Sequence, residues 1–194
     1  MLDLTPAAAR MAAVVAAVGD EQLDTPTPCP AYRLGDLLDH VSGLSRAFTD
    51  AANKTTAADA GPPPVPDASR LGADWRTRIP EELATLAEAW KDPTAWSGMT
   101  RAGGIDLPGE VGGLVALDEL VVHGWDVARA SGQPYECDAA SLEASLEFVS
   151  QFSGPRSEAD QGGLFGPVVE VPDDASDLDR LIGLAGRDPA WTPD

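Results

Sequence analysis

The sequence predicts an all-α protein, a four-helix bundle with additional short helices and a loop-rich C-terminal tail. Apolar residues recur at helical spacing in several long segments, and stretches rich in proline and glycine separate these segments. Such helices bury their apolar stripes against one another, and the cores of the resulting bundles commonly bind metals. The 194 residues suffice for one such core, so we expect residues 1–194 to form a single domain.

The first two helices are marked by their starts and by their stripes. Thr5-Pro6 is typical of a helix start, and the first helix is expected to end before Gly19. Residues 25–30 are rich in proline and predict a rigid loop that leads to the second helix. His40 borders the apolar stripe of this second helix. The stripe consists of Leu34, Leu37, Val41, Leu44 and Phe48.

A third helix is expected between two irregular segments. Residues 53–69 are too polar and proline-rich to pack, which predicts a surface loop. Pro80 lies inside the helical pattern that follows and predicts a kink or an interruption. Residues 93–109 have no regular pattern and leave room for a short extended segment. The apolar stripe of the third helix is Trp75, Ile79, Leu83, Leu86 and Trp90.

The fourth helix is expected from about Glu110 to Ala130, because Gly132 and Pro134 then end it. A fifth helix is expected to begin near Asp138. From residue 154 onward the pattern predicts mostly loop, with one short final helix over residues 178–184. The apolar face of the fifth helix is Leu142, Leu146, Val149 and Phe152.

Composition limits the classes of partner. There are 32 acidic and 13 basic residues, a net charge of -19, which disfavours binding to nucleic-acid phosphates or to anionic membranes. No apolar run approaches the roughly 18 residues of a membrane span, and the N-terminus lacks the basic start of a signal peptide. We therefore expect a cytoplasmic protein. Cys29 and Cys137 are too few for a disulfide framework, and the sequence allows a homodimer without requiring one.

Three polar side chains share one stripe of the fourth helix. At about 100° per residue, Glu119, His123 and Asp126 fall within about 60° of one another, among apolar neighbours. Burying a carboxylate and an imidazole there costs several kcal/mol unless each finds a partner, and a divalent metal is one such partner. His40, the other of the two histidines, lies on the second helix. Two histidines and a carboxylate from two helices would make a three-ligand site.

Each of these residues also has a purely structural explanation. A single histidine beside an apolar stripe is commonly a neutral imidazole hydrogen-bonded in a core, and Glu119 with His123 matches an ordinary i,i+4 pair. Asp126 is expected either to accept a hydrogen bond from a ligating histidine or a metal-bound water, or to pair with Arg129 or Arg33.

Two further residues near these positions have open roles. Asp36, one turn before His40, either orients that imidazole or is solvated. Cys29 lies in the proline-locked loop and is expected to pack rather than to react.

Four segments together resemble a known family. These are residues 27–32 (TPCPAY), 36–40 (DLLDH), 119–130 (ELVVHGWDVARA) and 186–191 (GRDPAW). They are similar to actinobacterial metal-binding proteins related to the N-terminal domain of mycothiol-dependent maleylpyruvate isomerase, which belong to the DinB-like superfamily of four-helix bundles. The resemblance covers nearly the whole chain. The ending GRDPAW is expected to have a packing role.

The resemblance implies a ligand set and a cosubstrate. The metal, usually zinc in this family, would be held by His40, Glu119 and His123, with a low-molecular-weight thiol such as mycothiol as cosubstrate. The sequence has Tyr32 where the family often has tryptophan, so the aromatic character is kept. The isomerase carries an additional C-terminal domain that contributes to its active site. Because residues 1–194 do not contain that domain, we do not expect maleylpyruvate isomerisation.

Three hypotheses about function follow. Three protein ligands leave one coordination position open, which is typical of catalytic zinc. The first hypothesis is a zinc-dependent thiol transferase that joins a thiol cosubstrate to a small electrophile, with Asp126 or a water as proton acceptor. The second is a metal-dependent hydrolase that uses Asp126 as base. The third is a non-catalytic metal-binding or regulatory module.

Overall fold

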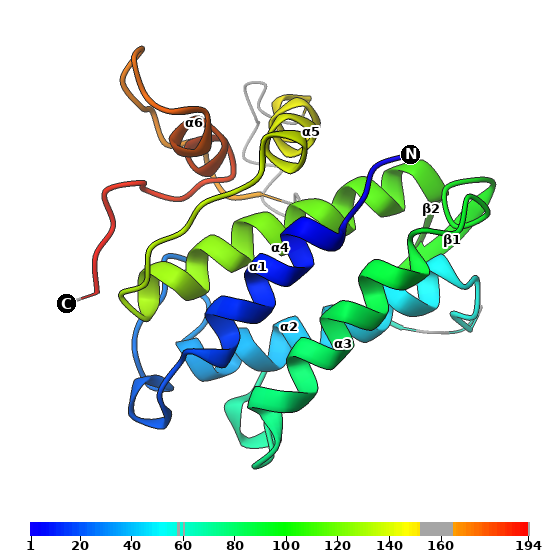
Figure 1. The fold of residues 1–194 in the computed structure, drawn as a ribbon, viewed down its shortest axis with the longest axis horizontal. Helices are drawn as coiled ribbons and strands as arrows, with labels where there is room; N and C mark the ends of the chain where they lie inside the picture. Colours follow the sequence, from blue (N-terminus) through cyan, green and yellow to red (C-terminus); the bar gives the residue numbers. More distant parts are fainter. Residues whose placement is uncertain (58, 60, 152–164, 194) are drawn as a thin grey trace.

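The computed structural model describes residues 1–57, 59, 61–151 and 165–193 and confirms the predicted all-α fold. Its bundle consists of α1 (Thr5–Ala16), α2 (Leu34–Ala52), α3 (Trp75–Ala89) and α4 (Gly109–Ala130). Both α1 and α2 pack against α3 and α4. Two further helices, α5 (Ala139–Ser150) and α6 (Asp177–Leu184), lie beside each other on one side of the bundle, with α5 against α4 (Figure 1).

Local sequence signals begin several of these helices. Pro6 occupies the first turn of α1, as its fixed φ angle favours. The Asp138 side chain accepts a hydrogen bond from the backbone N–H of Ser141 at the start of α5. At the start of α6, the Ser176 hydroxyl accepts the backbone N–H of Asp179. These caps satisfy N–H groups that have no partner inside a helix.

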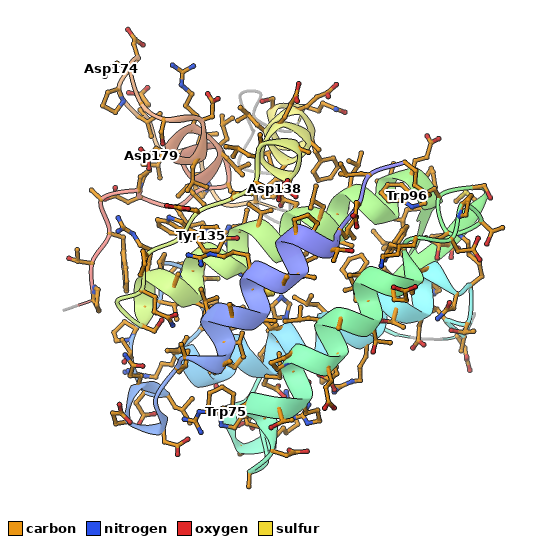
Figure 2. All side chains as sticks on the ribbon, in the orientation of Figure 1. Trp75, Trp96, Tyr135, Asp138, Asp174 and Asp179 are labelled. Carbon is orange, nitrogen blue, oxygen red and sulfur yellow. The ribbon has the colours of Figure 1, made fainter. Side chains whose placement is uncertain are left out.

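The core lies between the four helices of the bundle. Every apolar residue predicted for the stripe of α2 is buried, and so is every one predicted for α3. Helix α4 is buried along most of its length, so it is the central helix of the molecule. Figure 2 shows Trp75 at the beginning of α3 and Trp96 at the opposite end of the bundle. The most deeply buried large side chains include Met11, Leu37, Leu38, Ile79, Leu83, Leu86, Leu117 and Leu120.

Of the kink or interruption expected at Pro80, the interruption does not occur in α3. The helix is continuous over Trp75–Ala89 with Pro80 inside it. Trp75, Ile79 and Leu83 are all buried on one face of the helix, on both sides of the proline. Packing of this face offsets the hydrogen bond that a proline cannot donate.

The segment between α3 and α4 contains a hairpin. Strand β1 (Met99–Ala102) pairs antiparallel with β2 (Ile105–Pro108). Gly103 and Gly104 form the turn with φ angles of 60° and 84°, a combination that two-residue hairpin turns need and that glycine adopts without strain. The sequence thus contained the turn signal, although it predicted only a short extended segment.

The remaining connections agree with the expected loops. Two 3-10 turns, η1 (Asp20–Gln22) and η2 (Ala68–Arg70), are the only helical pieces in the described part of the two long connections before α3. The expected final helix is present as α6. Phe152, expected on the apolar face of the fifth helix, lies outside the described residues. Within the described residues, no helix combines the length and the apolar character that a membrane span requires.

Candidate metal centre

The candidate centre lies where α2 faces α4. Leu37, Leu38 and Val41 are completely buried and fix the face of α2 that packs inward, so His40 stands at the edge of that face. Glu119 and His123 are one turn apart on α4 and project together. The packing of α2 against α4 therefore brings His40 to the pair on α4.

The three side chains converge at their tips. Oε2 of Glu119 lies 3.1 Å from Nε2 of His123 and 3.5 Å from Nε2 of His40. The two imidazole rings meet edge to face, with 5.0 Å between their centroids and 88° between their planes. One ligand atom from each residue lies within 4.8 Å of the others. The residues predicted as ligands are thus brought together.

The arrangement fits a divalent metal better than a closed hydrogen-bonded cluster. Oε2 of Glu119 is buried, and its contacts with the two imidazole nitrogens do not have the full geometry of hydrogen bonds. Bonds of about 2.0–2.2 Å to one ion would place tetrahedral donors roughly 3.4 Å apart, so small side-chain rotations suffice. Two imidazole nitrogens and one carboxylate oxygen are a common catalytic zinc donor set.

One side of the centre is open to solvent. The side chains of His40 and Glu119 are 24% and 27% exposed, whereas that of His123 is 9% exposed. Tyr32 stacks on His40, with 5.5 Å between ring centroids and 30° between planes. The centre therefore lies near the surface at His40 and Glu119, although Oε2 of Glu119 itself is buried.

Hydrogen bonds within the loop stabilise the segment that carries Tyr32. The Thr27 hydroxyl lies 2.8 Å from the carbonyl oxygen of Cys29 and 2.9 Å from that of Tyr32. Burial raises the pKa of the Cys29 thiol, which keeps it protonated and unreactive at neutral pH. This agrees with the expected packing role of Cys29.

Asp126 lies behind His123, on the side away from Glu119. Nδ1 of His123 is 2.9 Å from Oδ2 of Asp126, and the same oxygen accepts a hydrogen bond of 3.1 Å from Nη2 of Arg187. The Asp126 side chain is fully buried. Of the alternatives left open by the sequence, the contact with a candidate ligand is the one observed. The other proposed partners are engaged elsewhere, Arg129 with the carbonyl of Pro189 and Arg33 with that of Asp24.

Comparison with known proteins places these residues in a family. The family model for the mycothiol maleylpyruvate isomerase N-terminal domain matches residues 4–128. The chain belongs to this family. The match spans α1 to nearly the end of α4 and includes all three candidate ligands and Asp126, and the helical fold is the DinB-like bundle expected from the resemblance.

Relatives of this family member share most of its length. Two uncharacterized proteins of Mycobacterium tuberculosis, from strains CDC 1551 and H37Rv, are each 28% identical to it over 180 residues. Each alignment covers 91% of both chains, so the similarity continues well beyond the matched domain. No solved structure matches the chain.

The ionisation states of Glu119 and His123 in the candidate centre depend on each other. Burial opposes ionisation of Glu119, but the two imidazoles beside it hold its pKa well below the usual range. Burial likewise opposes protonation of His123, yet the Asp126 and Glu119 carboxylates raise its pKa to about 9. Without a metal, His123 therefore carries a proton at neutral pH, and a metal must displace that proton to bind Nε2.

The sequence did not identify two residues of this site. Asp118 is buried next to Glu119, and burial raises its pKa well above the usual range, which favours a neutral carboxyl group. Arg187, in the ending GRDPAW, was expected only to pack, but it contacts Asp126. Its place in a motif shared with the resembling family was the available signal.

Asp36 has a role at the start of α2 and not at the centre. Its two oxygens accept hydrogen bonds from the backbone N–H groups of Ala68 and Arg33, at 2.9 Å and 3.3 Å. Asp36 thus caps α2 and ties η2 to it, and neither alternative from the sequence describes it fully.

Proposed function

We propose that this protein is a metal-dependent thiol transferase, which joins a low-molecular-weight thiol of the mycothiol type to a small electrophile. The observation that carries the proposal is the convergence of the buried Oε2 of Glu119 and two imidazole Nε2 atoms, whose contacts do not have the full geometry of hydrogen bonds. The chain belongs to the family of the mycothiol maleylpyruvate isomerase N-terminal domain, which supports a thiol of the mycothiol type as cosubstrate. The two free cysteines suit the reducing, cytoplasmic setting in which such a thiol would act.

His40, Glu119 and His123 would hold the metal, and zinc is the proposed ion because two imidazoles and a carboxylate are a known catalytic zinc donor set. When bound, the ion would supply a position at which a thiol loses its proton more readily than in water. The thiol would enter from the solvent-exposed side, past His40 and Glu119, where Tyr32 offers an aromatic face.

Asp126 orients the His123 ring for metal binding. The Asp126 carboxylate faces Nδ1, which fixes the ring and leaves Nε2 directed at the centre. Asp126 reaches the centre only through this ring, since its Oδ2 is shared by His123 and Arg187. In the proposal Asp126 therefore orients His123, and a water on the open side accepts the thiol proton.

The same geometry weighs against hydrolysis. A hydrolase of this design needs a base beside the attacking water. The candidate for that base was Asp126, which lies on the far side of His123 from Glu119. The non-catalytic metal-binding module is the alternative that the experiment has to separate from the transferase.

The experiment measures thiol conjugation by purified protein loaded with zinc, using mycothiol and chlorodinitrobenzene. The sulfur–carbon bond forms, the carbon–chlorine bond breaks, chloride leaves and the thiol proton passes to solvent. We expect acceleration by the zinc-loaded protein and a return to the uncatalysed rate in His123→Ala. Cys29→Ser is the matched control and should retain full activity, because the nucleophile belongs to the cosubstrate.

Two results would contradict the proposal. If Cys29→Ser abolishes conjugation and His123→Ala does not, the nucleophile is the protein's own thiol. If the zinc-loaded protein binds its metal but neither accelerates conjugation nor binds a thiol across several candidates, the protein is a non-catalytic metal-binding module.

A further inference from the structure

The segment that follows α6 reaches the metal centre from outside the matched family domain. Residues 185–191 lie far beyond residue 128, where the family match ends. Gly186, with a φ angle of 82°, turns the chain at the end of α6. A Cβ atom at Gly186 would come within 2.8 Å of the Gly166 backbone, so glycine is required there. This turn directs Arg187 towards α4.

Two hydrogen bonds fix the orientation of the Arg187 side chain. Its Nη1 donates to the carbonyl oxygen of Ala185 at 2.7 Å, and its Nη2 donates to Oδ2 of Asp126 at 3.1 Å. The Arg187 side chain is 12% exposed and that of Asp126 is fully buried. A charge-assisted hydrogen bond shielded from water is stronger than one at the surface.

One carboxylate oxygen joins the tail to a candidate ligand. Oδ2 of Asp126 faces both Nη2 of Arg187 and Nδ1 of His123. If the guanidinium is removed, the buried carboxylate keeps one partner and can rotate away from the imidazole. The ring would then no longer be fixed with Nε2 towards Glu119 and His40.

We propose that Arg187 is a positioning residue of the metal centre: it holds Asp126 against Nδ1 of His123, so that the C-terminal segment completes a site built on α2 and α4. This inference rests on the proposed metal-binding function of His40, Glu119 and His123. It extends that function by giving the segment outside the matched domain a part in the site.

A second arginine on the same interface provides a matched control. Arg129 of α4 donates to the carbonyl oxygen of Pro189, so it also ties the segment to α4, but this hydrogen bond does not involve Asp126. Loss of either arginine loosens the segment. Only loss of Arg187 removes a partner of Asp126.

The test compares the affinities of Arg187→Met, Arg187→Lys, Arg129→Met and the unchanged full-length protein for Zn²⁺, measured by chelator competition. Loss of the group hydrogen-bonded to a metal-ligating histidine weakens metal binding by about 10–100-fold. Because Arg187 acts on His123 through Asp126, we expect the lower end of this range, about tenfold, for Arg187→Met. Arg187→Lys should recover part of this loss because an ammonium can still donate to Asp126. Arg129→Met should stay within about threefold of the unchanged protein, well below the effect of losing a residue that orients a ligand, because the hydrogen bond of Arg129 goes to Pro189 and not to Asp126.

A second readout uses metal-free protein. With only two histidines, ¹⁵N-histidine labelling gives two imidazole spin systems, which His40→Gln assigns. We expect the His123 ring signals to shift in Arg187→Met and to stay in place in Arg129→Met. Far-UV circular dichroism of each variant verifies that the helices remain.

These readouts distinguish the positioning role of Arg187 from the metal-binding function. Unchanged zinc affinity together with unchanged His123 signals in Arg187→Met would overturn the positioning role of Arg187, and so would equal losses in Arg187→Met and Arg129→Met. If the unchanged protein binds no zinc while the His123 signals still depend on Arg187, the metal-binding function fails and the positioning of His123 stands.

Discussion

Helix α4 is packed differently on the two sides of Asp118, and residues 109–117 are here its first half and residues 118–130 its second half. In the first half, Gly112 and Gly113 remove side chains so that Trp90 and Trp96 can pack against the helix. In the second half, Asp118, His123 and Asp126 are buried as polar groups. In the first half, small residues make room for tryptophan rings, whereas the second half contains buried polar groups, of which His123 and Asp126 pair with each other. Burying carboxylates and an imidazole costs stability, so a cluster of this kind is a candidate functional site.

The largest effect expected in the second half is loss of metal binding in His123→Ala. We expect zinc affinity to fall by more than the roughly 100-fold that marks the upper range for outer partners, because a ligand itself is removed. Elemental analysis and chelator competition measure the loss, and circular dichroism should show intact helices. Full zinc occupancy in His123→Ala would mean that the second half of α4 is not the site.

Removal of the metal should lower stability without unfolding the bundle. Zinc at a hundredfold excess over its Kd adds about 2.7 kcal/mol if it binds only the folded state. For a chain of this size, chelation should lower Tm by roughly 5–11 °C. The helices should persist at room temperature because the buried apolar core does not depend on the centre. Loss of helical circular dichroism on chelation would show that the metal is structural.

Zinc affinity should depend on pH through His123. Its pKa of about 9 means that the metal displaces a proton at neutral pH, so apparent affinity should fall by up to about tenfold per unit below pH 9. Glu119, whose pKa is held low, stays ionised over this range. The folding stability of the metal-free protein should change with pH in the opposite direction from the zinc affinity. Because the folded pKa lies above the usual 6.5, the stabilisation from protonated His123 is complete below about 6.5 and is lost as the pH rises through 9. Chelator competition between pH 6 and 8 measures how zinc affinity changes with pH. An affinity that stays constant over this range would contradict this pairing of charges.

The smallest effect is expected in the first half of α4. A Cβ atom at Gly113 would lie 2.5 Å from the Trp96 ring, which is anchored by a hydrogen bond from its Nε1 to the Trp90 carbonyl. Gly113→Ala should therefore lower the free energy of unfolding by about 1 kcal/mol, since overpacking outweighs the gain in helix propensity.

Gly43→Ala in α2 is the control for this prediction, because a Cβ atom there would meet no atom within 4 Å. It should stabilise the protein by about 0.5–1 kcal/mol. Denaturant unfolding measures both changes, and zinc affinity should be unaltered in both variants. A change of equal sign in the two variants would remove the distinction between packed and open glycines.

The sequence predicted those features that local patterns determine. Helical spacing and caps predicted the helices, and the i,i+4 pair of Glu119 and His123 predicted one side of the centre. Identifying His40 as the third residue was possible because the chain has only one other histidine. Two features depended on tertiary contacts instead. Pro80 stays within a continuous α3 because its neighbours are buried, and Arg187 meets Asp126 across 61 residues of chain. Spacing patterns do not report such contacts.

The convergence of His40, Glu119 and His123 on one ion is tested most directly by zinc K-edge X-ray absorption of the loaded protein and of a His40→Ala, His123→Ala double variant. We predict one zinc per chain, with two imidazole nitrogens and a carboxylate oxygen at about 2.0–2.2 Å in the unchanged protein. The double variant should lose the imidazole scattering together with the metal. A spectrum without imidazole, or one that is identical in the double variant, would contradict this account of the site.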